Sequence, residues 1–142
     1  MKAKEKNFED IKLGESVSFE RTVSDSDLTK FADLSGDYNP LHIDSDYAAS
    51  TEFNGRVVYG MFLGALVGRL VGMELPGKKA LLLKECLEFK SPARIGDDLL
   101  VKGEVVHKSQ FSQLIELRIE ISRGKEILVV GSACVKILKN KK

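Results

Sequence analysis

The sequence predicts an α+β protein in which an antiparallel sheet wraps around one long buried helix. Three observations lead to this prediction: one strand-like run opens the chain, helical segments and a long apolar segment follow, and four strand-like runs close it. Antiparallel sheets often bury one face and expose the other, which suits such an order. The 142 residues are enough for one domain, with a core over about residues 10–138. Residues 1–9 and 139–142 are expected to be flexible.

The first elements are a strand and two short helices. Residues 16–23 form a strand-like run, and Ser24 then has the character of a helix N-cap with Asp27 three residues later. This helix is expected to end at Gly36, because glycine suits the C-terminal cap. Asp44 is expected to cap a second short helical piece, after which a loop leads into the apolar segment.

The apolar segment over residues 59–73 is predicted to be the buried helix, ended by Pro76-Gly77. The wider apolar stretch over residues 57–75 resembles a membrane span, but Arg69 would cost about 2.5–3.5 kcal/mol in a bilayer. The flanking strands favour a helix enclosed by sheet. Glycines recur every fourth residue, at Gly60, Gly64, Gly68 and Gly72. Each interior glycine costs about 0.5–1 kcal/mol relative to alanine, so we expect a backbone to approach this side of the helix closely.

Four strands are predicted after the helix, over residues 80–90, 99–107, 114–121 and 126–138. The third alternates apolar and charged side chains, which is typical of a strand with one face in water. Arg123-Gly124 turns the chain so that the last two strands form a hairpin. These strands complete the sheet that covers the helix.

Composition excludes several classes of function. The chain has 22 Lys and Arg against 21 Asp and Glu, so it lacks the broad basic surface that nucleic acids require. Cys86 and Cys134 lack the spacing of metal ligands or of a disulfide framework, so we expect no metal site and a reducing, cytoplasmic location. The charged N-terminus lacks the apolar stretch of a signal peptide. We expect neither a nucleic-acid nor a membrane partner.

Asp37 and His42 are candidates for an acid/base pair. On a continuous helix, five residues separate two side chains by about 140°, and on a straight strand the two would face opposite sides. Only a turned backbone brings them together, and Asn39-Pro40 predicts such a turn because Pro40 disfavours helix at Asn39. Spacing alone leaves a second interpretation open, in which Asp37 caps a turn and His42 is a hydrogen-bonded core residue. The other histidine, His107, is interpreted as a surface residue of a strand.

The stretch from Phe31 to His42, with its Gly-Asp-Tyr-Asn-Pro-Leu-His core, resembles the signature of the MaoC-like, R-specific enoyl-CoA hydratases. The similarity continues through Asp44, residues 47–49, 53–61, 75–77 and 87–89, Pro92 and residues 96–97. The resemblance implies a hot-dog fold, a homodimer or larger homo-oligomer, and a substrate thioester carried by coenzyme A or acyl carrier protein. It implies that Asp37 and His42 hold a water for syn addition to a trans-2-enoyl thioester, with the Gly60 amide as oxyanion donor. No cofactor is expected, because the thioester itself activates the alkene.

Four further residues are expected at the substrate site: Asn39, Leu41, Tyr59 and Met61. Asn39 is also expected to shape the loop through side-chain hydrogen bonds. Members of the family typically carry His-Gly-Met where this chain has Tyr59-Gly60-Met61. A tyrosine hydroxyl donates a hydrogen bond but carries no positive charge near neutral pH. Tyr59 therefore either orients the loop, as a histidine could, or alters the substrate preference.

Two other functions stay open. A hot-dog thioesterase generally places an acidic residue on the buried helix, and residues 59–73 contain none. A non-catalytic acyl-thioester-binding domain would keep the fold, but it gains nothing from a desolvated acid/base couple at Asp37 and His42. Binding of crotonyl-CoA without turnover would indicate the binding domain.

Overall fold

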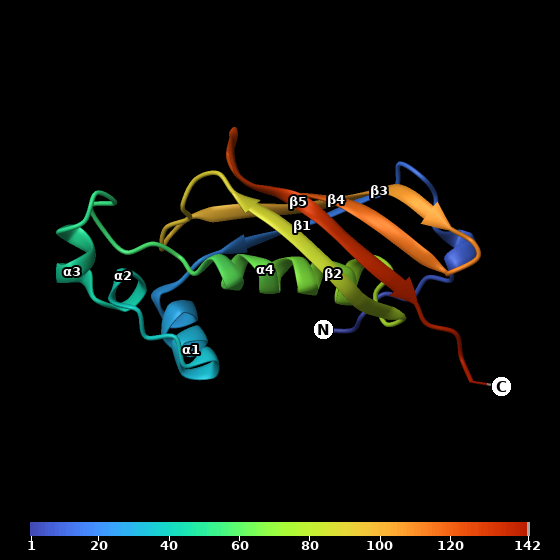
Figure 1. The fold of residues 1–142 in the computed structure, drawn as a ribbon, viewed down its shortest axis with the longest axis horizontal. Helices are drawn as coiled ribbons and strands as arrows, with labels where there is room; N and C mark the ends of the chain where they lie inside the picture. The colour runs from blue at the N-terminus through green and yellow to red at the C-terminus, as the bar shows by residue number, and fades with distance from the viewer. Residues whose placement is uncertain (142) are drawn as a thin grey trace.

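Five strands form one antiparallel sheet in the order β1-β3-β4-β5-β2, and a long helix lies along one face of it (Figure 1). The strands are β1 (Ser16–Thr22), β2 (Ala80–Phe89), β3 (Asp98–Ser109), β4 (Leu114–Arg123) and β5 (Glu126–Ile137). The helix is α4 (Gly60–Arg69), continued by the π-helical turn η2 (Leu70–Glu74). The computed structural model describes residues 1–141; Lys142, the end of the predicted flexible tail, lies outside the described residues. The predicted α+β architecture, a hot-dog fold, is confirmed.

The core lies between the sheet and α4. Along β4 the inward side chains are buried and alternate with exposed charged ones; the buried set is Ile115, Leu117, Ile119 and Ile121. From the helix, Leu63, Leu66 and Val67 pack into the same cluster. Gly103 of β3 leaves room for Leu70 of η2, because an added Cβ there would lie 2.6 Å from Cδ2 of Leu70. The apolar segment that imitates a membrane span is thus core, and no helix within residues 1–141 has the length and apolarity to cross a bilayer.

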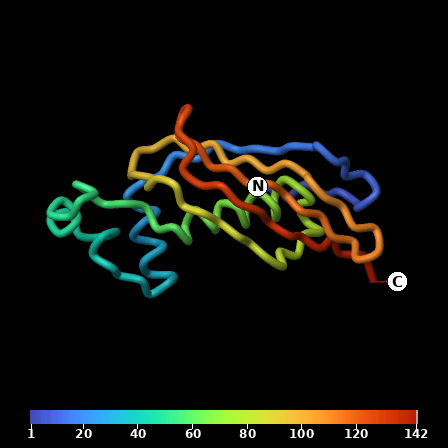
Figure 2. Tube along the Cα trace, turned by 45° about the horizontal axis from the view of Figure 1, so that its top comes forward, coloured from blue at the N-terminus to red at the C-terminus, as the bar shows by residue number. Residues whose placement is uncertain are grey.

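Three short helices project beyond one end of the sheet, as Figure 1 and Figure 2 show. They are α1 (Asp25–Ser35), α2 (Pro40–Ile43) and α3 (Ser45–Ala49). The predicted capping box of α1 is present: Ser24 Oγ accepts from the Asp27 amide at 3.1 Å, and the Asp27 carboxylate accepts from the Ser24 amide at 2.9 Å. Gly36 ends α1 with a φ of 76°, and Asp44 caps α3. The predicted caps of α1 and α3 are confirmed, whereas the short helix α2 was not predicted.

The N-terminal segment contributes Phe8 and Ile11 to the core. Phe8, in the 3-10 turn η1 (Phe8–Asp10), is only 3% exposed. Lys108 Nζ lies 4.5 Å from the centre of the Phe8 ring and donates to the carbonyl oxygens of Phe8 and Ile11. An aromatic side chain and a strand lysine thus anchor this segment to the sheet.

The glycine side of the helix also differs from the prediction. A Cβ on Gly60 would meet the Phe89 ring at 3.1 Å, and one on Gly64 would meet the Glu85 carboxylate at 3.6 Å. At Gly68 and Gly72 no heavy atom of the described residues lies within 4 Å of that position. Side chains of β2, rather than a backbone, therefore face this side at Gly60 and Gly64.

Candidate active site

The loop between α1 and α2 reverses the chain between Asp37 and His42. Two side chains build the reversal through consecutive local hydrogen bonds: Asp37 Oδ1 accepts from the Asn39 amide at 3.0 Å, and Asn39 Oδ1 accepts from the Leu41 amide at 3.0 Å. Pro40 then starts α2, where its missing amide hydrogen costs nothing. The predicted turn, and the loop-shaping role of Asn39, are confirmed.

The imidazole of His42 is held in one orientation. Its Nδ1 lies 2.8 Å from the carbonyl oxygen of Val57. Because a carbonyl can only accept, Nδ1 carries the hydrogen, and Nε2 of the neutral ring is left as a hydrogen-bond acceptor. The ring also stacks on Tyr59, with centroids 4.0 Å apart and an interplanar angle of 28°. His42 can therefore accept a hydrogen bond from water through Nε2.

Asp37 and His42 line one cavity of about 260 Å³ at the start of α4. Its remaining walls are Phe31, Ser35, Tyr59, Gly60, Met61 and Phe89. Within residues 1–141, no direct ion pair joins the two side chains. Both groups are thus available to a molecule in this space.

A second cavity of about 430 Å³ adjoins the first, since His42, Gly60 and Phe89 line both. Most of its other walls are apolar, and they come from the chain before α4, from α4 itself and from the segment after β2: Phe53, Val57, Val58, Leu63, Pro92 and Ala93. Lys90 and Ser91 complete the lining. The arrangement combines a polar end at Asp37 with an apolar space next to it, which is typical of small-molecule sites.

Gly60 lines both cavities. Gly60 is the first residue of α4, and the N-cap Tyr59 makes no side-chain cap to the helix. The first amides of a helix have no partner within it, and the positive end of the helix dipole favours negative charge there. The site therefore offers a donor for an oxyanion.

Of the four predicted substrate residues, two line the candidate site and two do not. Tyr59 and Met61 line the smaller cavity, and Met61 is 65% exposed. Asn39 and Leu41 line neither cavity. The Asn39 side chain accepts the Leu41 amide hydrogen within the turn. Phe89 was not among the predicted site residues, because its contact with the start of α4 depends on how β2 crosses the helix. It reaches both cavities from the end of β2.

Glu85 of β2 is a second acidic group that the site prediction did not include. Its Oε1 is buried and has no hydrogen-bond partner among residues 1–141, and its carboxylate faces Gly64, one turn along α4 from Gly60. Burial raises the pKa of Glu85. The residue lines neither cavity of the candidate site.

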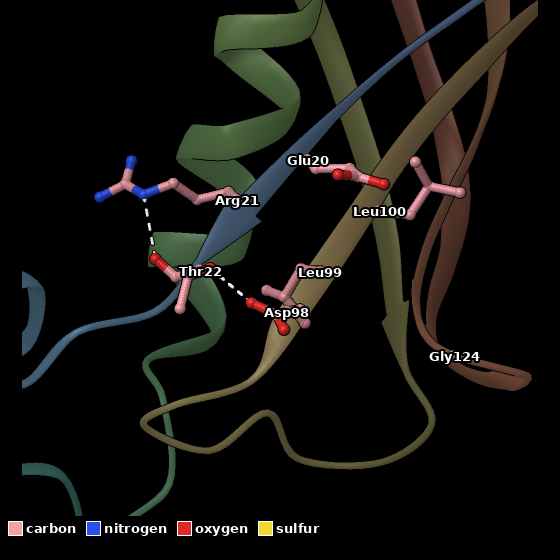
Figure 3. Close-up of a pocket in the computed structure, with 7 residues that line it drawn as sticks. All are labelled: Glu20, Arg21, Thr22, Asp98, Leu99, Leu100 and Gly124. Atoms are coloured by element: carbon pink, nitrogen blue, oxygen red, sulfur yellow. Dashed lines mark hydrogen bonds between the residues drawn. The ribbon is translucent and has the colours of Figure 1, made fainter.

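A larger open cavity, of about 560 Å³, lies on the strands β1 and β3 (Figure 3). Three of its polar side chains already have partners: Thr22 Oγ1 donates to Asp98, and Arg21 Nε donates to the Thr22 carbonyl at 3.3 Å. In Figure 3 the Arg21 side chain extends away from Glu20 and Leu100. This surface contains none of the candidate catalytic residues, so the smaller cavities at α4 are the better candidate site.

The chain is similar over most of its length to known hydratases and dehydratases. The chain is 35% identical over 132 residues to the 3-hydroxybutyryl-CoA dehydratase of Methylorubrum extorquens, covering 93% of this chain and 84% of that protein. It is 35% identical over 130 residues to the (R)-specific enoyl-CoA hydratase of Rhodospirillum rubrum, covering 92% and 90%. The solved structure of the (R)-hydratase from A. caviae superposes with a TM-score of 0.87 at 33% identity, covering 91% of this chain and 98% of that one.

The match to a known domain extends over most of the fold. Residues 9–124, from η1 to the end of β4, match the MaoC like domain. This range includes the Asp37–His42 loop, the start of α4 and Phe89. The chain therefore belongs to the MaoC-like domain family.

Proposed function

We propose that this protein catalyses the R-specific hydration of trans-2-enoyl thioesters and, in reverse, the dehydration of (R)-3-hydroxyacyl thioesters. The observation that carries the proposal is the common cavity of Asp37, His42 and Gly60. The names of the relatives support it, since they describe hydratases and dehydratases of acyl-CoA substrates.

Water is a weak nucleophile and needs a base. A water that donates one hydrogen to Asp37 and the other to Nε2 of His42 presents its oxygen to the substrate. As the oxygen bonds to the β-carbon, one O–H bond breaks, the carboxylate takes the proton, and the alkene electrons move into the thioester as an enolate. The α-carbon then takes a proton from the same pair and the carbonyl re-forms, so that one water has been added. Such positioned acid/base groups contribute about 10²–10⁴-fold in rate.

The enolate oxygen needs stabilisation while it carries charge. The Gly60 amide is the proposed donor, because it stands at the free N-terminus of α4 beside the cavity. A preorganised donor of this kind contributes about 10²–10³-fold. The adjoining apolar cavity is the proposed space for the rest of the thioester, with coenzyme A or acyl carrier protein as carrier outside it.

Purified protein is expected to consume crotonyl-CoA, measured as loss of the enoyl-thioester absorbance, and to form (R)-3-hydroxybutyryl-CoA on chiral analysis. Parallel detection of free thiol separates the thioesterase alternative, in which Glu85 would be the acidic group against the helix. Release of coenzyme A without hydration would favour the thioesterase. Binding of crotonyl-CoA with neither reaction would favour the acyl-thioester-binding domain, and either result would contradict the proposal.

We also propose that the protein forms at least a homodimer through the β2 edge of the sheet. β2 has a hydrogen-bonded neighbour on one side only, and apolar side chains remain exposed along it: Leu81 is 47% and Leu83 53% exposed. Exposed apolar edge strands pair readily with another chain. At Gly68 of α4 and Gly72 of η2, no described atom beyond the local backbone lies within 4 Å of an added Cβ, which leaves this side of the helix open.

Sedimentation velocity at micromolar concentration is expected to give a dimer or a larger species. Leu83→Lys should shift the distribution towards monomer, because a lysine on an edge strand opposes pairing. Val106→Lys is the matched control, since Val106 is an exposed apolar residue of the interior strand β3. A monomeric wild-type protein would contradict the proposal.

A further inference from the structure

Tyr59 makes three contacts that converge on the loop carrying the candidate acid/base pair. Its hydroxyl donates to the backbone carbonyl of Asp37 at 2.6 Å. Its ring stacks on His42 at 4.0 Å and packs against Phe31 with centroids 4.8 Å apart. The residue is 2% exposed, so these contacts are made away from solvent.

The hydroxyl is not free to bind a substrate as a donor. It has one hydrogen, and the Asp37 carbonyl accepts it. Burial, and secondly the negative charge of Asp37, raise the pKa of Tyr59, so its phenol is neutral near neutral pH. A histidine at this position could take up a proton and a positive charge, whereas the tyrosine adds no charge beside His42.

The four residues from Val57 to Gly60 hold both ends of the loop and the oxyanion donor. Val57 fixes His42 through its carbonyl, and Tyr59 fixes Asp37 through its hydroxyl. Gly60 follows Tyr59 directly and starts α4. A displacement of Tyr59 would therefore move the carboxylate, the imidazole and the amide relative to one another.

We propose that Tyr59 is a positioning residue, which sets the separation of Asp37 and His42 and ties both to the start of α4. This inference rests on the proposed hydratase function, because it assigns Tyr59 a role in that reaction rather than in substrate recognition. Small errors in the placement of reacting groups lower the rate of the chemical step more than they weaken binding.

Tyr59→Phe keeps the stacked ring and removes only the hydrogen bond to Asp37. With crotonyl-CoA, kcat is expected to fall about tenfold, since a partly buried carbonyl loses its donor, while KM stays within about twofold. Tyr38→Phe is the matched control. Tyr38 lies in the same loop and its hydroxyl donates to Asp33 at 2.8 Å, so its loss should leave kcat unchanged. A wild-type kcat in Tyr59→Phe, or a rise in KM alone, would overturn the inference.

A second readout is independent of turnover. The chain has two histidines, so the proton spectrum contains two imidazole Cε1–H signals, and a His107→Gln variant identifies them. The His42 signal is expected to carry the ring-current shift of the stacked Tyr59, to keep it in Tyr59→Phe and to lose it in Tyr59→Leu. A signal that does not respond to Tyr59→Leu would overturn the stacked arrangement. Inactivity of the wild type with this signal in place would instead contradict the proposed function alone.

Discussion

Asp37→Asn is expected to lower kcat/KM for crotonyl-CoA by at least about 10²-fold, because the amide cannot take the proton of the attacking water. The substitution should leave the loop intact. Asp37 Oδ1 accepts from the Asn39 amide, and an asparagine oxygen accepts in the same way. Loss of activity with unchanged thermal unfolding would thus report on the base and not on the turn.

The matched control for this substitution is Asp33→Asn. Asp33 is an exposed carboxylate of α1 whose Oδ1 accepts from the Tyr38 hydroxyl, and it lines neither cavity. Its amide variant should retain wild-type kcat/KM. Near-wild-type turnover in Asp37→Asn, measured beside this control, would remove Asp37 from the mechanism.

Gly131→Ala is expected to destabilise the fold by at least about 2 kcal/mol. Gly131 of β5 lies opposite Leu87, and a Cβ there would lie 2.0 Å from the backbone oxygen of Cys86. A backbone atom cannot rotate away, so β2 would have to move off β5. Because β2 carries Phe89 to both cavities, kcat/KM should fall as well.

Gly103→Ala separates this effect from the general cost of replacing a strand glycine. The added methyl would meet Cδ2 of Leu70, the end of a flexible side chain that can shift. We expect a change in the free energy of unfolding of about 1 kcal/mol or less. Urea denaturation of both variants measures the difference, and equal destabilisation by the two substitutions would contradict this description of the β2–β5 pairing.

The elements of the fold could be predicted because their signals are local. Ser24, Asp27 and Gly36 specify the start and end of α1 through bonds within a few residues. The alternation of β4 predicts its buried face, and the observed strand bounds differ from the predicted ones by one or two residues. The Asp37–His42 turn could also be predicted from local signals, since Asn39 and Pro40, which form it, lie within it.

The unpredicted features depend on contacts between distant segments. That Phe89 faces Gly60 and Glu85 faces Gly64 depends on how β2 lies across α4, which no local pattern encodes. The burial of Phe8 likewise depends on Lys108, a hundred residues away in sequence. The role of Tyr59 was open at the sequence level, because its hydroxyl partner is the carbonyl of a residue 22 positions earlier.

The most direct test is hydration of crotonyl-CoA by the wild-type protein in D₂O. It asks whether a single water, held between one carboxylate and one imidazole, supplies both the hydroxyl at the β-carbon and the hydrogen at the α-carbon. Attack and protonation from one pair of side chains must occur on one face of the alkene. We therefore expect a single product with R configuration at the β-carbon and deuterium added syn to the hydroxyl, assigned from proton coupling constants. Anti addition would show that the carboxylate and the imidazole do not act together on one water. So would a mixture of syn and anti products that forms before the α-hydrogen can exchange with solvent.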